Sequence, residues 1–149
     1  MGVIVCCVDE SPVSRDATRV AARLAAEFGL ELVLLHVGPS PTAPGTSAVP
    51  GGHARLAHDE REAGDRLLAE IAREAGLPDS VERRVELGDT AHTILAVCDE
   101  LKAAFVVLGS RGRGKIASAM LGSVSTAVAA KATIPVVIVP HGSAAERGA

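Results

Sequence analysis

The sequence has almost no aromatic side chains and no surplus of positive charge. Its 149 residues include two phenylalanines, Phe28 and Phe105, but no tryptophan or tyrosine, and the formal net charge is −3. Proteins that bind nucleic acids need a broad basic surface and often use aromatic rings on which bases stack. The composition therefore argues against nucleic acid as a partner.

Long apolar runs and paired cysteines are also lacking. No run approaches the roughly 18 apolar residues that span a bilayer, and the first residues lead into a strand-like segment without a basic signal region. Cys6, Cys7 and Cys98 form neither a C-x-x-C motif nor an even set. His53 and His58 lack the spacing of a metal motif. We therefore expect a cytoplasmic protein with reduced thiols, no membrane contact and no metal site of its own.

Short apolar runs alternate with helical patterns along the chain. The predicted strands are residues 3–8, 32–37, 81–87, 105–108 and 134–140. The run at 81–87 mixes charged and apolar residues, as expected for a half-exposed edge strand, whereas 3–8 is continuously apolar, as in a strand buried on both faces. Parallel strands need right-handed helical crossovers, so the pattern predicts an α/β fold with a doubly wound, five-stranded parallel sheet and four helices. We expect one domain over residues 1–140 and a disordered tail at 141–149.

The helix boundaries follow from local signals. Gly29 is expected to end the first helix and Asp89 to cap the third. An irregular loop is predicted at residues 38–52, followed by a long helix from about Ala54 to Ala75. The residues of this helix that we expect to face the core are Ala63, Leu67, Ile71 and Ala75.

The stretch from Leu108 to Ser123 has the composition of an anion-binding loop. Its glycines, which let backbone amides approach a ligand and allow positive φ angles, are Gly109, Gly112 and Gly114. Its cations, close together in an acidic chain, are Arg111, Arg113 and Lys115. Gly122 and Ser123 then open a helix whose free amides and dipole favour a phosphate.

Three glycine motifs compete for this stretch. A P-loop fits Gly109, Gly114 and Lys115 but fails at Ile116, which has no hydroxyl to hold magnesium. A Rossmann fingerprint should follow the first strand and precede an acidic residue by about 20 positions, and neither condition is met. The third pattern is G-x-x-G, nine residues and then G-[ST]. It is met in full by Gly109, Gly112, Gly122 and Ser123.

Two purely structural explanations stay open beside the ligand hypothesis. The glycines could only make a tight strand-to-helix loop, with Ser123 as a helix cap. Asp9, at the carboxyl end of the first strand, could hold ribose hydroxyls. Alternatively, Asp9 or Ser11 could simply support the turn or cap the next helix. If strands one and four are neighbours, Asp9 and the loop from Gly109 share the crevice where the strand order reverses.

On these motifs the chain resembles the nucleotide-binding branch of the universal stress protein family over residues 3–140. The resemblance implies a Rossmann-like fold of the adenine nucleotide alpha hydrolase type, with strand order 3-2-1-4-5. It also implies that ATP is bound, with Asp9 at the ribose and the backbone of Val37 at the adenine. The residues implied around the phosphates and ribose are Gly109, Arg111, Gly112, Gly122, Ser123, Val124 and Ser125, and we add Leu108 and Arg113 to the candidate nucleotide site.

The resulting functional expectation is an ATP-binding stress-response or regulatory protein that binds Mg²⁺ with the nucleotide. A slow ATPase or phosphotransferase using the same loop remains an alternative, as does an interaction module that does not bind nucleotides. We also expect a homodimer through the last strand. Residues 136–139 are apolar on both faces, and an uncharged sheet edge of this kind invites pairing with a second copy.

Overall fold

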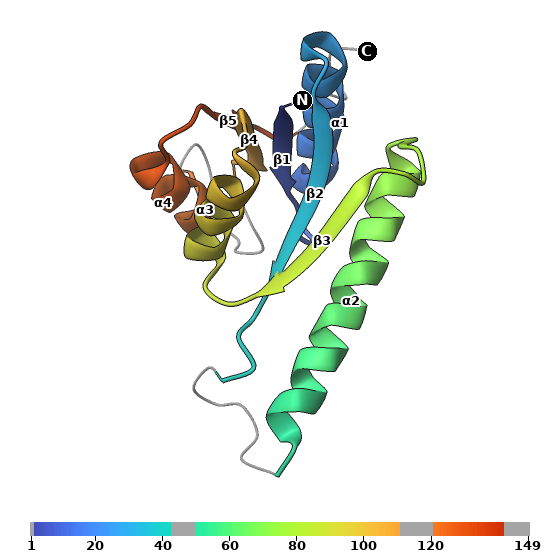
Figure 1. The fold of residues 1–149 in the computed structure, drawn as a ribbon, viewed down its shortest axis with the longest axis vertical. Helices are drawn as coiled ribbons and strands as arrows, with labels where there is room; N and C mark the ends of the chain where they lie inside the picture. The colour runs from blue at the N-terminus through green and yellow to red at the C-terminus, as the bar shows by residue number, and fades with distance from the viewer. Residues whose placement is uncertain (1, 43–49, 111–120, 142–149) are drawn as a thin grey trace.

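The computed structural model describes residues 2–42, 50–110 and 121–141. Strands and helices alternate along the chain (Figure 1). The elements are β1 (Val3–Cys7), α1 (Val13–Phe28), β2 (Glu31–Gly38), α2 (Gly52–Glu74), β3 (Glu82–Leu87), α3 (Thr90–Leu101), β4 (Phe105–Gly109), α4 (Ser123–Lys131) and β5 (Val136–Val139). Each predicted strand and helix is therefore present. Most of the expected tail lies outside the described residues, but its first residue, His141, lies with Nδ1 3.4 Å from Oδ2 of Asp16.

The strands form a single parallel sheet in the order β3-β2-β1-β4-β5, which confirms the predicted topology. From β1 the chain proceeds outward through β2 to β3. It then crosses back to place β4 on the other side of β1 and ends at β5. The direction of winding thus reverses between β1 and β4, and ligands of such sheets bind outside the carboxyl ends of the strands at this point.

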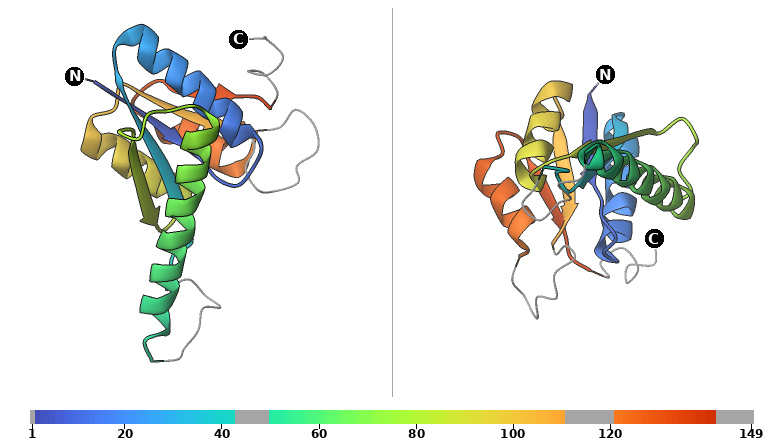
Figure 2. Two further views of the ribbon diagram at one scale, coloured as in Figure 1. Left: turned by 90° about the vertical axis from the view of Figure 1, so that its right-hand side faces the viewer. Right: turned by 90° about the horizontal axis from the view of Figure 1, so that it is seen from below.

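Helices cover both faces of the sheet, with α1 and α2 on one face and α3 and α4 on the other (Figures 1 and 2). Successive side chains of β1 alternate between two cores: Ile4 and Cys6 pack under α1 and α2, whereas Val5 packs under α3 and α4. Because the central strands are buried on both faces, they appear in the sequence as continuous apolar runs.

The buried face of α2 is shifted along the helix by one position from the predicted face. Ala63 is exposed, whereas Gly64, Leu68, Ile71 and Ala72 are buried. A Cβ atom at Gly64 would lie 2.7 Å from Cγ1 of Val85, closer than real Cβ contacts. The helix therefore packs on the sheet at its glycine, where the helix backbone can approach most closely. Two predicted helix ends are confirmed: Gly29 is left-handed at φ 64°, and Asp89 accepts a hydrogen bond from the His92 amide at 3.0 Å.

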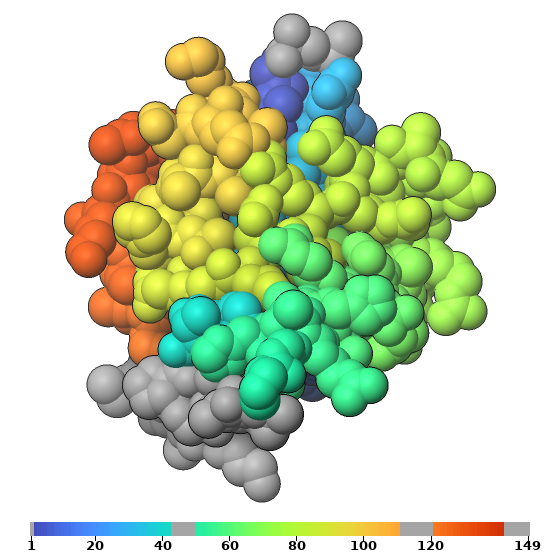
Figure 3. All heavy atoms as spheres, turned by 60° about the horizontal axis from the view of Figure 1, so that its bottom comes forward, coloured from blue at the N-terminus to red at the C-terminus, as the bar shows by residue number. Residues whose placement is uncertain are grey.

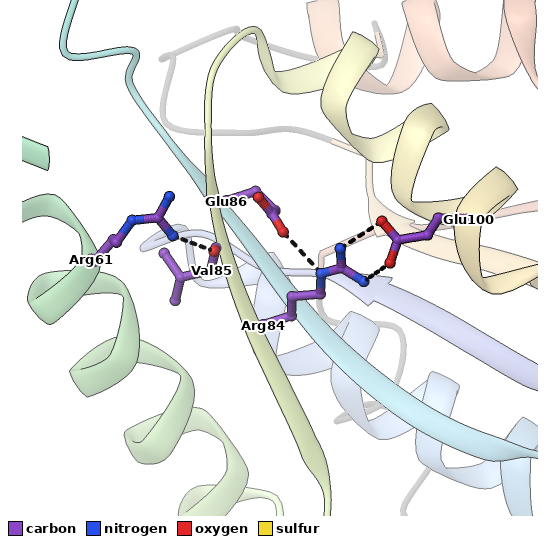
Figure 4. Close-up of polar contacts among 5 residues, drawn as sticks. All are labelled: Arg61, Arg84, Val85, Glu86 and Glu100. Carbon is purple, nitrogen blue, oxygen red and sulfur yellow. Dashed lines mark hydrogen bonds and ion pairs between the residues drawn. The ribbon is translucent and has the colours of Figure 1, made fainter.

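Charged side chains surround the edge strand β3 (Figure 4). Arg84 donates to both carboxylate oxygens of Glu100 on α3, at 2.5 and 2.8 Å, and to Glu86 at 2.9 Å. These hydrogen bonds from Arg84 lower the pKa of Glu100. From the other side, Arg61 of α2 donates to the carbonyl oxygen of Val85 at 3.1 Å. The predicted half-exposed character of this edge is confirmed, and one of its backbone acceptors is occupied.

The cysteines are free thiols. Cys6 and Cys98 are buried and Cys7 is half-buried. Burial raises the pKa of Cys6 to about 12 and that of Cys98 to about 11, and it also raises the pKa of Cys7. Within the described part of the chain, no helix is long and apolar enough to cross a membrane.

Candidate functional site

The carboxyl ends of β1 and β4 lie side by side, because Cys6 of β1 pairs with Val107 of β4. Asp9 follows β1 by two residues, and Ser110 follows β4 directly. Figure 3 brings this end of the molecule forward: the segment after β2 (cyan) lies between the start of α2 (green) and α3 (yellow). The topology thus brings Asp9 and the beginning of the glycine-rich stretch to one edge of the sheet.

Asp9 is bound to the turn between β1 and α1 through one carboxylate oxygen. Its Oδ1 accepts the Ser11 amide at 2.8 Å and the Ser14 hydroxyl at 3.0 Å, and it also contacts the Ser11 hydroxyl. The Asp9 amide donates to Oγ of Ser14 at 2.8 Å. Oδ2 has no hydrogen-bond partner among the described residues. Asp9 therefore supports the turn, as one of the two hypotheses held, and keeps a second oxygen that could accept a hydrogen bond from a ligand.

Gly109 is a glycine because of space, not because of its backbone angles. A Cβ atom there would collide with Cγ1 of Val13 and would lie 3.1 Å from its Cγ2. Gly109 does not use the positive φ that a glycine allows, since the positive-φ glycines among the described residues are Gly29, Gly51, Gly76 and Gly88. The missing side chain lets the first turn of α1 pack against the end of β4, which keeps α1 next to the candidate site.

The two ends of the glycine-rich stretch are joined at the carbonyl oxygen of Ser110. This oxygen accepts the Gly122 amide at 2.7 Å, and the Ser125 hydroxyl lies 3.1 Å from it. The Ser110 amide in turn donates to the carbonyl oxygen of Val139 at 2.9 Å. Ser125 is 2% exposed. The start of α4 is therefore fixed to the ends of β4 and β5, and the Ser125 hydroxyl serves this junction.

The first turn of α4 has backbone donors that no described residue accepts. Gly122 is the N-cap, with φ −66° and ψ 165° and no side-chain cap, and the first intrahelical bond runs from the Thr126 amide to the Gly122 carbonyl. The amides of Ser123, Val124 and Ser125 have no acceptor among the described residues. Ser123 is exposed as the first helical residue, so the hypothesis that it only caps the helix is wrong.

The remaining predicted residues fall into two groups. Val37 and Leu108 have buried side chains, 8% and 4% exposed, within the core under α3 and α4. Any contact that they make with a ligand at the sheet edge would involve their backbone. Arg111, Gly112 and Arg113 lie outside the described residues.

Sequence reasoning missed two residues that determine the position of Asp9. Ser14 contacts both the amide and the carboxylate of Asp9. His36 is 4% exposed, and its Nδ1 lies 2.9 Å from the carbonyl oxygen of Val8. The spacing of Asp9, Ser11 and Ser14 could have signalled the first contact, whereas nothing local signals the second.

A metal site was not expected in the chain itself. Over residues 2–42, 50–110 and 121–141, no group of three or more histidine, cysteine, aspartate or glutamate side chains is placed to hold a metal ion.

Comparison with curated proteins gives close relatives. A universal stress protein of Mycolicibacterium smegmatis is 39% identical over 89% of this chain and 43% of its own length. Universal stress protein YxiE of Bacillus subtilis is 32% identical over 89% of this chain and 94% of its own length. The chain thus spans less than half the length of the mycobacterial relatives and nearly the full length of the Bacillus protein.

Solved structures share the fold. Universal stress protein UspA of Lactobacillus plantarum superposes with a TM-score of 0.79 at 20% identity, over 93% of this chain and 97% of its own. A universal stress protein crystallised in complex with cAMP superposes with a TM-score of 0.61 at 28% identity, over 94% of this chain and 97% of its own. The model of the universal stress protein family matches residues 1–140. With this match and the YxiE relative, the chain belongs to the universal stress protein family.

Proposed function

We propose that this protein binds an adenine nucleotide, with ATP and Mg²⁺ preferred, at the carboxyl edge of the sheet between β1 and β4. In this proposal the bound nucleotide controls a regulatory or stress-response interaction with partners. The structurally similar protein crystallised in complex with cAMP, 28% identical, supports adenine nucleotides as the ligand class.

The observation that carries the proposal is the meeting of complementary groups at one edge. The free amides of α4 and the positive end of its dipole attract phosphate. Oδ2 of Asp9, which has no hydrogen-bond partner in the part of the chain that the structure describes, lies beside the neighbouring strand end and suits the hydroxyl groups of a ribose and not a phosphate. A ligand that carries both phosphate and ribose satisfies both groups at once, which a simple anion does not.

Residue roles follow from this arrangement. The phosphates would meet the amides of Ser123 and Val124 at the start of α4, with Gly122 leaving room for them. Arg111, Gly112 and Arg113 would approach from the stretch between Ser110 and Gly122. Adenine would lie against the backbone of Val37. Mg²⁺ would arrive with the phosphates, neutralising part of their charge.

Isothermal titration calorimetry with ATP and AMP tests the proposal, using a matched pair of variants at Ser123. Ser123→Asp places a negative charge where phosphate should bind, whereas Ser123→Asn is its uncharged isostere. An acidic residue in the first turn stabilises a helix, so lost binding cannot be attributed to unfolding. A charge-assisted contact to phosphate is worth ~1.5–3 kcal/mol, so Ser123→Asp should weaken ATP binding at least tenfold and Ser123→Asn much less.

The outcomes separate the parts of the proposal. If neither nucleotide binds to the wild type, the nucleotide-binding function is wrong. If AMP binds as tightly as ATP, the site stands but the preference for a triphosphate does not. A phosphate-release assay addresses the enzymatic alternative, because turnover above about 1 s⁻¹, at the lower end for kinases, would indicate a phosphotransferase or ATPase.

The proposed assembly is a homodimer formed through β5. The sheet has two edges, and they differ in chemistry. At β3, Glu82 and Arg83 are exposed and Arg61 occupies the carbonyl of Val85, whereas the β5 residues Val136–Val139 carry no charge and the first three are only partly buried. Charged side chains discourage edge-to-edge pairing, so a second copy is more compatible with β5 than with β3.

A further inference from the structure

His36 of β2 lies where β1, β2 and α2 meet, next to the end of β1 that leads to Asp9. The residue is 4% exposed, and its Cδ2 would lie 3.1 Å from a Cβ atom placed on Gly64 of α2. The absence of a side chain at Gly64 therefore leaves room for the imidazole. Its Nδ1 lies 2.9 Å from the carbonyl oxygen of Val8.

The direction of this hydrogen bond follows from chemistry. A carbonyl oxygen only accepts hydrogen bonds, so Nδ1 of His36 must carry a proton and donate it. The backbone pairing of β1 with β2 ends at Cys7 and Leu35. Beyond it, the Val8 amide donates to the Leu35 carbonyl at 2.8 Å, and the His36 ring binds the Val8 carbonyl. A side chain thus extends the attachment of β1 to β2 past the last paired residues.

The Val8 carbonyl belongs to the same peptide unit as the Asp9 amide. That amide donates to Oγ of Ser14 at 2.8 Å. A peptide unit is planar and rigid, so the two hydrogen bonds hold it at opposite sides, one from β2 and one from α1. The Cα atom of Asp9 is part of this plane, so the point from which its side chain starts is fixed, and the hydrogen bonds of Oδ1 then orient the carboxylate.

We infer that His36 is a positioning residue for nucleotide binding, which acts through the Val8–Asp9 peptide unit to orient Asp9 toward the ribose. The inference rests on the proposed function, since it assigns His36 to the same site. Without the donor of His36, the peptide unit keeps only the Ser14 hydrogen bond of the two, so the position of Asp9, and with it the position of its second oxygen, is less narrowly defined. His36 makes no contact with the nucleotide itself.

A matched pair of substitutions isolates the donor. In His36→Asn the amide nitrogen stands as many bonds from the backbone as Nδ1 does, so it can still donate to Val8. His36→Leu has the same branching without a donor. Calorimetry with ATP and with 2′,3′-dideoxy-ATP measures the preference for ribose hydroxyls, and Asp9→Ala sets the value expected when the ribose contact is lost. Simple destabilisation would weaken both ligands alike and leave their ratio unchanged.

The expected result is a preference for ATP of about tenfold or more in the wild type and His36→Asn, which falls toward one in His36→Leu and Asp9→Ala. If His36→Leu does not fold, His36→Gln replaces it, since its donor lies one bond too far out. Amide hydrogen exchange at Asp9 in the nucleotide-free protein should also quicken in His36→Leu but not in His36→Asn.

Failure of the inference and failure of the proposed function look different. If the wild type binds ATP and His36→Leu keeps the full preference for ribose hydroxyls, the positioning role of His36 is wrong and nucleotide binding stands. If the wild type binds neither nucleotide, the proposed function fails and the role of His36 fails with it.

Discussion

The hydroxyl of Ser125 lies 3.1 Å from the carbonyl oxygen of Ser110, across the base of the glycine-rich stretch. Ser125 is buried, whereas Ser123, one half-turn earlier in α4, is exposed and its hydroxyl has no partner among the described residues. The two serines of this helix start therefore differ in function, although the resemblance implies the same surroundings, the phosphates and ribose, for both.

Alanine substitution should separate these functions. Ser125→Ala removes a buried hydrogen bond and should lower the free energy of unfolding by ~1 kcal/mol. Ser123→Ala should change it by less than about 0.5 kcal/mol, as is usual for surface positions. Urea unfolding followed by circular dichroism measures both values. Equal losses of stability in the two variants would contradict the assignment of Ser125 to the junction with Ser110.

Gly109 and Val13 form a second pair that can be tested for stability. Gly109→Ala forces a methyl group into the side chain of Val13 and should destabilise the fold by ~1–3 kcal/mol, the usual range for overpacking. Val13→Ala removes the atoms with which that methyl collides. In a double-mutant cycle, the double variant should therefore be more stable than the two separate losses imply, by at least ~0.5 kcal/mol. Strict additivity would show that the glycine is needed for another reason.

The order of the strands was implied by the resemblance to the universal stress protein family. The sequence itself was sufficient to predict the strands, because a parallel sheet buried on both faces produces continuous apolar runs such as Val3–Val8. It was insufficient for the face of α2, where Ala63 fits the helical spacing but Gly64 packs. The reason is that Gly64 faces Val85 and His36, both distant in sequence, and periodicity carries no information about such close approach.

The same limit applies to the candidate site. The position of Asp9 at a strand end could be predicted from the length of one apolar run. The contacts of its peptide unit with His36 and Ser14 depend on how β2 and α1 pack, and the hydroxyl of Ser125 is directed by the end of β4. The motif carries no information about such supporting contacts between its residues and the rest of the fold.

The raised pKa of Cys6 predicts how stability depends on pH. Burial raises this pKa from 9.0 to about 12, so the folded protein keeps the neutral thiol at pH values where the unfolded chain ionises. The contribution of the neutral Cys6 thiol to the free energy of unfolding is therefore complete below pH 9, and it is lost as the pH rises from 9 toward about 12.

Urea unfolding between pH 8 and pH 11 should show stability declining more steeply in the wild type than in Cys6→Ala. The quantity to compare is the slope of the unfolding free energy against pH, because the alanine variant also loses packing at every pH. Alkylation of native Cys6 at neutral pH should likewise be slow and become fast in urea. Rapid labelling of the folded protein, or parallel pH profiles for the two proteins, would contradict the burial of this thiol.

The proposed dimer through β5 is best tested at Ile138. Val136 and Val137 pack against the two cores, so a charge at either position would also damage the fold, whereas Ile138 is partly buried and, of the described β5 residues, lies outside both clusters. Ile138→Lys should place an uncompensated charge on the edge and convert a dimer to a monomer. Ala69→Lys is the matched control, because it adds the same charge at an exposed position on α2.

Sedimentation equilibrium at micromolar concentration measures the mass of each variant, and thermal unfolding checks that both are folded. A monomeric wild type, or a dimer that both lysine variants retain, would show that β5 is not the interface.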